Sequence, residues 1–405
     1  MNRDQLYKKI DSFNDELINL RRHIHAHPEL SLAEFSTAKK IAKALRGHGF
    51  QVTENVGGTG VVALLKNGSG PLVMMRADMD GLPLKEKTNL SYASKDMQLD
   101  PVTGNTFPVM HACGHDVHIT ALIGTAKQMV DLKNYWRGTL MLIAQPAEER
   151  VLGAKNMMND NLWERFGQPD YALAFHVSSM LPSGVINVVN GSPYAGADTV
   201  DIYVHGIGAH GASPHTGKDP IVLGSQIVNS LQTLVSRELP PRQPGVVTVG
   251  AFHSGTKHNI ISDQAHLQLT VRNTSEKTRD TLLNGIKRIS ENLGRAAGLP
   301  EDKLPEVVVS EESTPPTLND EKLAIRLRGL WKEKMGTDQV TSYQSDGMGA
   351  EDFPFFTTEP KIPSVYFAVG GTNHEYFKAA LDGSGPPIPS HHSPCLLYTS
   401  DAADE

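Results

Sequence analysis

Residues 110–118, MHACGHDVH, place three histidines and one cysteine within a short segment. Imidazole nitrogens and thiolate sulfurs are ligands for zinc and other transition metals, so the chemistry that this segment predicts is metal binding. A histidine-rich turn is the alternative, because a single histidine on an apolar face is more commonly a core residue with satisfied hydrogen bonds. The segment leaves both interpretations open, and further ligands must come from other parts of the chain.

Other metal-capable side chains follow apolar runs that are typical of buried strands. These runs, within 71–77, 139–145, 171–175 and 363–369, are short and bounded by turn residues, as in a largely parallel sheet. The side chains after them are Asp78, Asp80, Glu148, Glu149, His176, His391 and His392. Ligands of open α/β sheets bind beyond the carboxyl ends of the strands, so we expect these four segments and 110–118 to meet at one sheet edge.

Each of these residues has a structural explanation when it is taken singly. His176 is typical of a core histidine at a strand end. The paired glutamates are typical of a helix N-terminus, where the helix dipole favours carboxylates. The aspartates suit turns, and the final histidines suit a disordered tail. The shared placement of all the segments favours one metal site over these separate explanations.

The elements that must position these residues follow two patterns. In 1–194 and 311–394, strand-like runs alternate with helix-like segments, which predicts an α/β metal-binding catalytic domain with a large mixed, mostly parallel sheet. Asp116 is expected to cap a helix over 116–132. Residues 195–310 follow the order β-α-β-β-α-β, typical of a ferredoxin-like α+β domain. We therefore expect this second domain to be inserted into the first.

Composition and charge argue against several classes of partner. The formal net charge is −7 without a basic block, which argues against nucleic acid. No apolar run is long enough to span a bilayer, which argues against a membrane protein. The polar N-terminus lacks the apolar core of a signal peptide, so we expect a cytoplasmic protein. Two cysteines, Cys113 and Cys395, are too few for a disulfide framework.

Seven motifs, in order from residue 21 to residue 394, make the chain similar to a known family of enzymes. It resembles the aminoacylase and carboxypeptidase group of two-metal amidohydrolases, in particular the branch of hippurate hydrolase and indole-acetyl-amino-acid hydrolase. The motifs are RRHIHAHPELS (21–31), RADMDGLP (76–83), MHACGHDVH (110–118), QPAEE (145–149), GIGAHGASPHTGKDPI (206–221), MGAEDFPFF (348–356) and HHSP (391–394).

The resemblance implies a set of metal ligands and a general base. Two divalent ions, of zinc, manganese, cobalt or nickel, would be held by Cys113, His115, Glu149, His176 and His392. Glu148 would take a proton from water and pass it to the leaving amine. Asp78 would contact a metal ligand on the side away from the ion and so orient it. Asp80 is the weaker candidate for this role. His111 and His118 are expected to support the site rather than to bind metal.

The resemblance also implies that residues 195–310 form a lid and the interface of a homodimer. His210 would reach the partner subunit's site and stabilise the oxyanion of the tetrahedral intermediate; a loop histidine is the alternative. Arg272 would clamp the carboxylate of the substrate, with Asn259 assisting; a surface arginine is the competing explanation. Glu351 is expected to shape the pocket.

The implied reaction is hydrolysis of the amide bond of an N-acyl or N-aroyl amino acid, which releases a carboxylic acid and a free amino acid. A dipeptidase or carboxypeptidase, or an enzyme acting on an N-acetyl-diaminopimelate-like compound, would need the same groups. The non-enzymatic alternative is a catalytically silent relative that binds an acyl amino acid or serves as a scaffold. A general base beside a metal ligand argues against it. A zinc nucleobase deaminase would need a paired-cysteine spacing that this chain lacks.

Two stretches depart from the pattern of that family. Gly-Gly commonly follows the paired glutamates there, whereas this chain has Arg150 and Val151. We expect the next helix to start differently and Arg150 to narrow the acyl pocket. Residues 395–405, CLLYTSDAADE, break the pattern after HHSP and resemble the in-frame translation of a sequencing adapter, so we expect a non-native tail.

Overall fold

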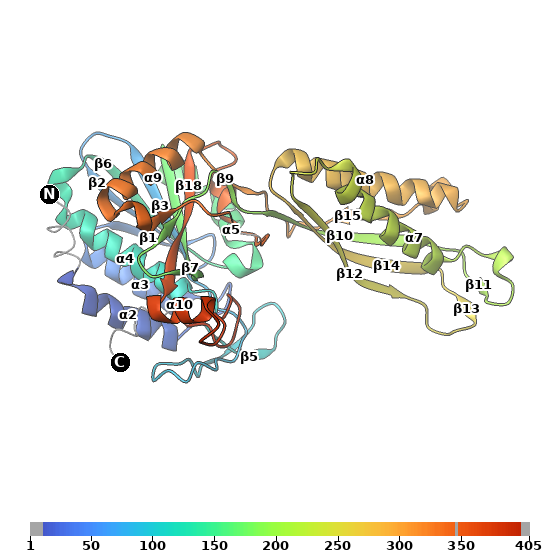
Figure 1. The fold of residues 1–405 in the computed structure, drawn as a ribbon, viewed down its shortest axis with the longest axis horizontal. Helices are drawn as coiled ribbons and strands as arrows, with labels where there is room; N and C mark the ends of the chain where they lie inside the picture. The colour runs from blue at the N-terminus through green and yellow to red at the C-terminus, as the bar shows by residue number, and fades with distance from the viewer. Residues whose placement is uncertain (1–10, 345–346, 398–405) are drawn as a thin grey trace. The chain divides into compact units, whose positions relative to one another are not determined.

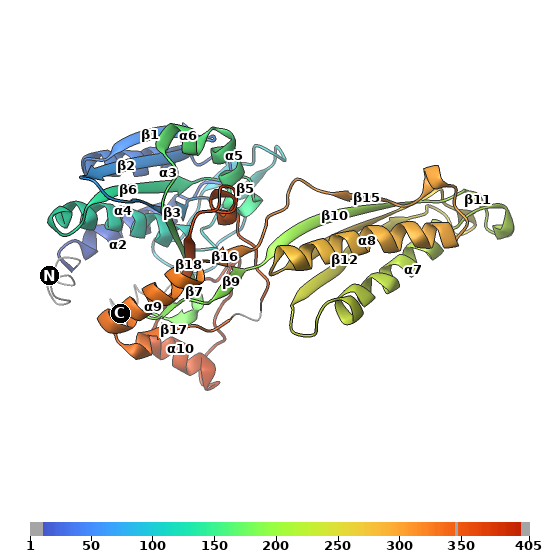
Figure 2. The ribbon, with the colours of Figure 1, turned by 90° about the horizontal axis from the view of Figure 1, so that it is seen from above.

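The computed structural model describes residues 11–344 and 347–397, which form two compact units. The first unit takes its residues from Met1–Pro193, Leu318–Ser345 and Asp352–Glu405. The second takes them from Tyr194–Thr317 and Asp346–Glu351, a range that contains the predicted insertion, 195–310. Figures 1 and 2 show the ribbon from two directions.

An eight-stranded sheet forms the centre of the first unit. Its strand order is β1 (Gln51–Val56), β2 (Gly60–Asn67), β6 (Gly138–Gln145), β3 (Leu72–Asp78), β7 (Tyr171–Pro182), β18 (Ser364–Thr372), β8 (Ile186–Asn187) and β17 (Val340–Thr341). The strands β6, β3, β7 and β18 are parallel, whereas β1 and β2 form antiparallel pairs at one edge. The prediction of a large mixed, mostly parallel sheet is confirmed, because uninterrupted apolar runs suit strands that are covered on both faces.

Helices cover both faces of this sheet. One face packs against α2 (Asn14–Ala26), α3 (Phe35–Gly47), α4 (His115–Asp131) and α9 (Glu321–Met335). The other face packs against α5 (Gly153–Asn159) and the short helix η7 (Phe353–Phe356). Leu45 and Leu122 are fully buried on the first face, and each such side chain contributes ~1.5–3 kcal/mol to folding. This packing fixes α4, which begins at the candidate ligand His115.

The start of α4 differs from the prediction. Gly114, with φ of 82°, is the N-cap residue, and no side chain caps the helix. The expected capping by Asp116 is therefore wrong: Asp116 lies inside the first turn and accepts hydrogen bonds from other segments. A tight left-handed residue at the cap requires glycine, and it lets Cys113 and His115 lie on either side of the bend.

The second unit is a four-stranded antiparallel sheet with two helices on one face (Figure 1). The strand order is β12 (Gly245–Ser254), β14 (Gln264–Asn273), β10 (Gly196–His205) and β15 (Glu306–Val309). The helices α7 (Pro220–Thr233) and α8 (Glu276–Ala296) bury their apolar sides against it. Asp219 caps α7, with Pro220 in its first turn. The chain order of these elements is the predicted β-α-β-β-α-β.

The remaining strands and α-helices of the described residues are short. They are β4 (Met97–Leu99), β5 (Thr106–Pro108), α6 (Leu162–Phe166), β9 (Gly191–Tyr194), β11 (Ala209–His210), β13 (Ile260–Ile261), β16 (Thr317–Asn319) and α10 (His374–Leu381). Among the described residues, no helix combines the length and apolar character that crossing a bilayer requires.

Candidate metal centre

The candidate ligands of the first unit gather beyond the carboxyl ends of its parallel strands. β3 ends at Asp78, and β6 ends at Gln145, just before the paired glutamates. β7 continues to Pro182, so His176 lies inside this strand rather than directly after its end. The last residue of β7 that pairs with β3 is Ala174, and His176 lies two positions further on. His176 is thus placed where the two strands stop pairing.

Within the first unit, four overlapping groups of side chains could each hold a metal ion. In each group, the ligand atoms all lie within 4.8 Å of one another. The groups are Cys113 with His115 and His176; Cys113 with Glu149 and His392; His115 with Glu148 and Glu149; and Asp78 with His115 and His118. Because Cys113, His115 and Glu149 each occur in more than one group, the cluster offers two neighbouring ion positions with shared ligands.

The surroundings of the His115 imidazole show whether these residues suit a metal. Both of its ring nitrogens, Nδ1 and Nε2, are buried and make no hydrogen bond within the described part of the chain. Carboxylate oxygens of Asp78, Glu149 and Glu148 lie 3.7, 3.9 and 4.0 Å from Nε2. These separations are too long for hydrogen bonds, but ligands bound at ~2.1 Å to one cation lie about 3–4 Å apart. With a thiol and two further imidazoles nearby, the donor set fits zinc and similar divalent ions.

Groups behind two of the histidines fix their orientation. Nδ1 of His176 lies 2.7 Å from the carbonyl oxygen of Val177, and Nδ1 of His115 lies 3.2 Å from Oδ1 of Asp80. The contact of His176 sets its tautomer and leaves Nε2 for a ligand, whereas the contact of His115 is an ion-pair distance that places the Asp80 carboxylate behind the ring. Nε2 of His176 lies 3.4 Å from the sulfur of Cys113. Both rings therefore present Nε2 to the cluster.

Asp78 and Asp80 each contact the Nδ1 atom of a different histidine. Oδ1 of Asp78 lies 2.5 Å from Nδ1 of His118, and Nε2 of His118 accepts a hydrogen bond from the Val177 N–H. Asp80, which the sequence analysis ranked below Asp78, is the one at Nδ1 of His115. The sequence contains a signal for this role of Asp80. The two aspartates are two positions apart on an extended segment, which directs both side chains to the same side.

The charges of the cluster shift the pKa values of its members. Burial, together with Glu149 and Glu148, raises the pKa of the Cys113 thiol. Burial opposes protonation of His115, but the nearby Asp78 and Asp80 outweigh it and raise the pKa of His115 to about 10. Burial lowers the pKa of His176. Without a cation, therefore, the thiol stays neutral and the proton on His115 compensates part of the carboxylate charge. A bound cation would replace both protons.

The motif at 21–31 supports the ligand loop, a role that the sequence analysis missed. Arg21 and His25 on α2 both contact Oδ2 of Asp116, at 3.1 and 3.0 Å. His25 also contacts Glu86 at 3.1 Å. Asp116 directly follows His115, so these buried ion pairs tie α2 to the start of α4. The sequence contains a signal for this role, because an arginine and a histidine one helical turn apart lie on the same face of a helix.

The histidine pair near the end of the described chain has two different environments. His392 lies 3.3 Å from Oε2 of Glu149, and its backbone N–H donates to the Ala112 carbonyl. His391 lies 3.1 Å from the Val177 carbonyl. Leu396, the second residue of the expected non-native tail, is buried beside Ala112. Residues 398–405 of that tail lie outside the described residues.

Arg150, which directly follows the paired glutamates, is paired with an aspartate. Its guanidinium donates to both carboxylate oxygens of Asp100, each at 2.8 Å. The next regular helix, α5, begins at Gly153. The expected narrowing of an acyl pocket by Arg150 stays a prediction.

The remaining candidates lie in the second unit. His210 is exposed on β11, and its Nδ1 accepts a hydrogen bond from the Ala212 N–H. Arg272 is half-buried on β14 and donates to the hydroxyl of Thr270. Burial lowers the pKa of Arg272. The side-chain oxygen of Asn259 is buried and has no hydrogen-bond partner in residues 11–344 and 347–397.

His210 and Arg272 belong to opposite ends of the sheet in the second unit. Arg272 pairs with Ala197, whereas Gln264, at the start of the same strand, pairs with His205. β11 follows His205 and pairs with β13, beyond the Gln264 end. Eight residues of strand separate the two ends, a distance of about 26 Å. Glu351 is buried in this unit, where its carbonyl accepts a hydrogen bond from the Thr314 hydroxyl.

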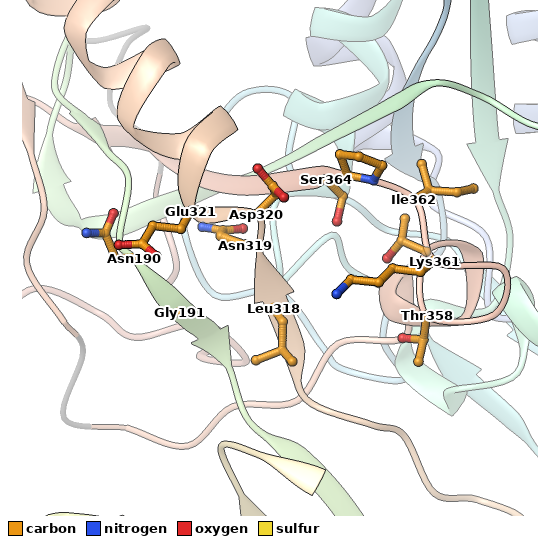
Figure 3. Close-up of a pocket in the computed structure, with 12 residues that line it drawn as sticks. Asn190, Gly191, Leu318, Asn319, Asp320, Glu321, Thr358, Lys361, Ile362 and Ser364 are labelled. Atoms are coloured by element: carbon orange, nitrogen blue, oxygen red, sulfur yellow. The ribbon is translucent and has the colours of Figure 1, made fainter.

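A cavity of about 750 Å³ lies elsewhere in the first unit (Figure 3). Asp320, Lys361 and Ser364 are among the residues that line it. Ser364 begins β18, and the residue paired with His176 is Ala368, four positions further along. The cavity is therefore at the amino end of the parallel strands, about 13 Å away along β18, and its lining contains none of the candidate ligands.

Comparisons with known proteins point to one family. The model of Peptidase family M20/M25/M40 matches residues 74–381. Thermostable carboxypeptidase 1 of Saccharolobus solfataricus is 36% identical over 376 residues, 92% of this chain and 90% of the relative. Hippurate hydrolase of Campylobacter jejuni is 37% identical over 362 residues, 89% of this chain and 90% of the relative. A solved Bacillus subtilis structure, described as a dinuclear metal-binding peptidase from the M20 family, has a TM-score of 0.76 and 29% identity, and the match covers 96% of this chain and 93% of that one.

Proposed function

Because the chain belongs to Peptidase family M20/M25/M40, we propose that it hydrolyses the amide bond of N-acyl or N-aroyl amino acids. The products are a carboxylic acid and a free amino acid. The observation that carries this proposal is the buried Nε2 of His115, which has no hydrogen-bond partner among the described residues and lies near three carboxylates, while the thiol of Cys113 belongs to the same cluster. The relative named hippurate hydrolase supports an acylated amino acid as the substrate class.

Two divalent ions, of zinc, manganese, cobalt or nickel, are the proposed cofactors. Their proposed ligands are Cys113, His115, Glu149, His176 and His392. The overlapping groups around Cys113 support this set, since one contains His176 and the other contains Glu149 and His392. When bound, the ions supply Lewis-acid polarisation of the scissile carbonyl and lower the pKa of the attacking water.

Glu148 is the proposed general base. Its Oε2 lies 4.0 Å from Nε2 of His115, so the carboxylate lies beside the ligand cluster. Glu148 takes a proton from water as the oxygen attacks the carbonyl carbon. It then delivers that proton to the nitrogen of the breaking C–N bond, so that the amino acid leaves as an amine. Asp80 behind His115, and Asp78 through His118, hold the surrounding imidazoles in place.

His210 is proposed to act on the site of a second copy of the chain. In the second unit, His210 and Arg272 lie at ends of the sheet that are about 26 Å apart, too far to contact one small substrate together. This separation supports a homodimer in which His210 of one protomer stabilises the oxyanion in the other. Exposed apolar side chains near β11, among them Ile207 and Ile260, offer contact area for such an assembly.

Arg272 is proposed to bind the substrate carboxylate. Asn259, its proposed assistant, accepts at its carbonyl from the Gly211 N–H and so lies at the His210 end of the sheet, and it would act with Arg272 only from a second copy of the chain. The half-buried guanidinium of Arg272 is less hydrated than a surface arginine, which strengthens its hydrogen bonds to a carboxylate. The side-chain N–H2 of Asn259 would donate to an oxygen of the substrate. A cytoplasmic location and the absence of nucleic-acid partners stay predictions of the sequence.

The experiment that tests this function uses metal-free protein and a panel of N-acyl and N-aroyl amino acids. Zinc, manganese, cobalt or nickel is added back, and product release is measured with wild type and with Glu148→Gln. We expect metal-dependent turnover that falls by at least about a thousandfold in Glu148→Gln, because the base is lost while the ligands remain. Binding of two ions without turnover of any substrate would contradict the proposal and favour the silent acyl-amino-acid-binding alternative.

A carboxypeptidase or dipeptidase is the second candidate, and the similarity to thermostable carboxypeptidase 1 favours it. The same ligands and base would serve, because the bond cleaved is again an amide next to a free carboxylate. Dipeptides with a free N-terminus belong in the panel. Faster turnover of dipeptides than of their N-acylated equivalents would select this activity.

A further inference from the structure

The turn that carries Glu148 and Glu149 is bounded on both sides by left-handed backbone. Ala147 has φ of 47°, and Val151 has φ of 56°. This conformation is unfavourable for residues with a Cβ atom and most of all for a β-branched residue such as valine. Neighbouring groups must therefore hold the turn in this shape.

Arg150 provides such a contact from within the turn. Its Nη2 donates to both carboxylate oxygens of Asp100 at 2.8 Å. Asp100 is only 3% exposed and is itself held, because its oxygens accept from the Val102 N–H and the Thr103 hydroxyl, each at 3.0 Å. The guanidinium is thus attached to a carboxylate with little freedom to move, in the loop between β4 and β5.

The β4–β5 hairpin is connected to the segment that holds the other end of the turn. Gln98 on β4 accepts from the Leu30 N–H and donates to the Ala33 carbonyl. The next residue, Glu34, is buried and accepts from the Ala147 N–H at 2.8 Å. Both ends of the glutamate turn are therefore held by one connected part of the first unit.

We propose that the Arg150–Asp100 pair is a positioning device, which keeps Val151 left-handed and thereby holds Glu149 and Glu148 at the ligand cluster. The inference rests on the proposed function, in which Glu149 binds metal and Glu148 is the base. A glycine in place of Val151 would adopt the same φ without strain. The Glu149 N–H also donates to Asp80 at 3.1 Å, and the Val151 N–H donates to the Glu148 carbonyl at 2.7 Å. The contact with Asp100 adds a side-chain restraint next to Val151, and Arg150 acts on the reaction through the turn without touching the substrate.

The test measures zinc affinity of the metal-free protein by competition with a chelator, alongside kcat and KM for the best substrate. We expect Arg150→Ala to weaken zinc binding about tenfold, as loss of a contact behind a ligand typically does, and to lower kcat more than it raises KM. Adding Val151→Gly to Arg150→Ala should return zinc affinity to within about threefold of wild type, because glycine keeps the turn left-handed without the tether.

Two further variants make the result specific. Asp100→Asn keeps one oxygen that can accept from the Val102 N–H, and its amide N–H2 can donate to the Thr103 hydroxyl. The variant loses the charge that pairs with Arg150, so it should reproduce Arg150→Ala in part even if the alanine variant folds poorly. Arg46→Ala removes an exposed pair with Glu54 in the same unit and should leave zinc affinity unchanged.

Zinc affinity also separates this inference from the proposed function. Wild type that binds zinc but cleaves no substrate would refute the function, while the affinities of the variants would still decide the positioning role. Equal zinc affinity in wild type and Arg150→Ala would overturn the inference. So would a double variant in which Val151→Gly restores nothing.

Discussion

Asp80 lies behind His115 at ion-pair distance: Oδ1 of the aspartate is 3.2 Å from Nδ1 of the imidazole. Both side chains are buried. The opposite nitrogen, Nε2, then lies 3.9 Å from Oε1 of Glu149 and 4.0 Å from Oε2 of Glu148. A carboxylate in this position makes an imidazole a stronger and better-oriented ligand. One contact thus links a residue of the RADMDG motif to the ion position beside the paired glutamates.

Replacing Asp80 with asparagine should weaken metal binding with little change in fold. We expect Asp80→Asn to lower zinc affinity by about 10–100-fold, because the imidazole loses its negatively charged partner. Competition with a chelator measures the effect. Asp198→Asn is the matched control: Asp198 is a buried aspartate of the second unit that pairs with Arg279, so its loss should leave zinc affinity unchanged.

Metal binding should release protons and strengthen as pH rises. Burial and the neighbouring glutamates raise the pKa of the Cys113 thiol, and the carboxylates raise the pKa of His115 to about 10, so both are protonated near pH 7 without a cation. Ligands must lose these protons to bind. Calorimetry in buffers of different ionisation enthalpy should show release of about 1–2 protons per chain, and fewer in Cys113→Ser. Heats that do not depend on the buffer would contradict this prediction.

His25 should make the stability of the protein depend on pH in the alkaline range. Burial opposes protonation, but Asp116 and Glu86 raise the pKa of His25 to about 9 from 6.5. A raised pKa in the folded state stabilises the fold fully below pH ~6.5, and this contribution is lost as pH rises through ~9. The shift corresponds to about 3 kcal/mol.

Chemical denaturation of the metal-free protein between pH 6 and 10 measures this effect. Wild type should lose stability across the range, and His25→Gln should be less stable at pH 6 and show a flatter profile. His27→Gln is the control, because His27 pairs with Asp96 at the exposed surface. Parallel profiles for wild type and His25→Gln would show that the buried pair does not carry the pH dependence.

Arg272 should determine the preference for substrates with a free carboxylate. Charge-assisted hydrogen bonds contribute about 1.5–3 kcal/mol, so we expect Arg272→Ala to raise KM about 10–100-fold and Arg272→Lys to raise it less. Steady-state kinetics on an N-acyl amino acid and on its amide separates the effects: the variant should lose discrimination between the two. Arg288→Ala, an exposed arginine paired with Glu238 in the same unit, should match wild type.

The sequence by itself determined the strands, the order of the elements and most of the cluster. Apolar runs identified β3, β6, β7 and β18 because a strand covered on both faces must be apolar throughout. The order β-α-β-β-α-β was visible because each element keeps its own hydrophobic period. The polar residues after those strands, such as Glu149 and His392, were predictable as neighbours because parallel strands end at the same edge.

Only the tertiary structure decided which groups touch within that cluster. Strand spacing could not rank Asp80 against Asp78 behind His115, because both lie on one short extended segment and the choice depends on where α4 begins. It could not connect Arg21 and His25 with Asp116, or Arg150 with Asp100, since each pair joins segments that are far apart in the chain. These contacts depend on side-chain geometry within the packed unit, and local periodicity carries no information about them.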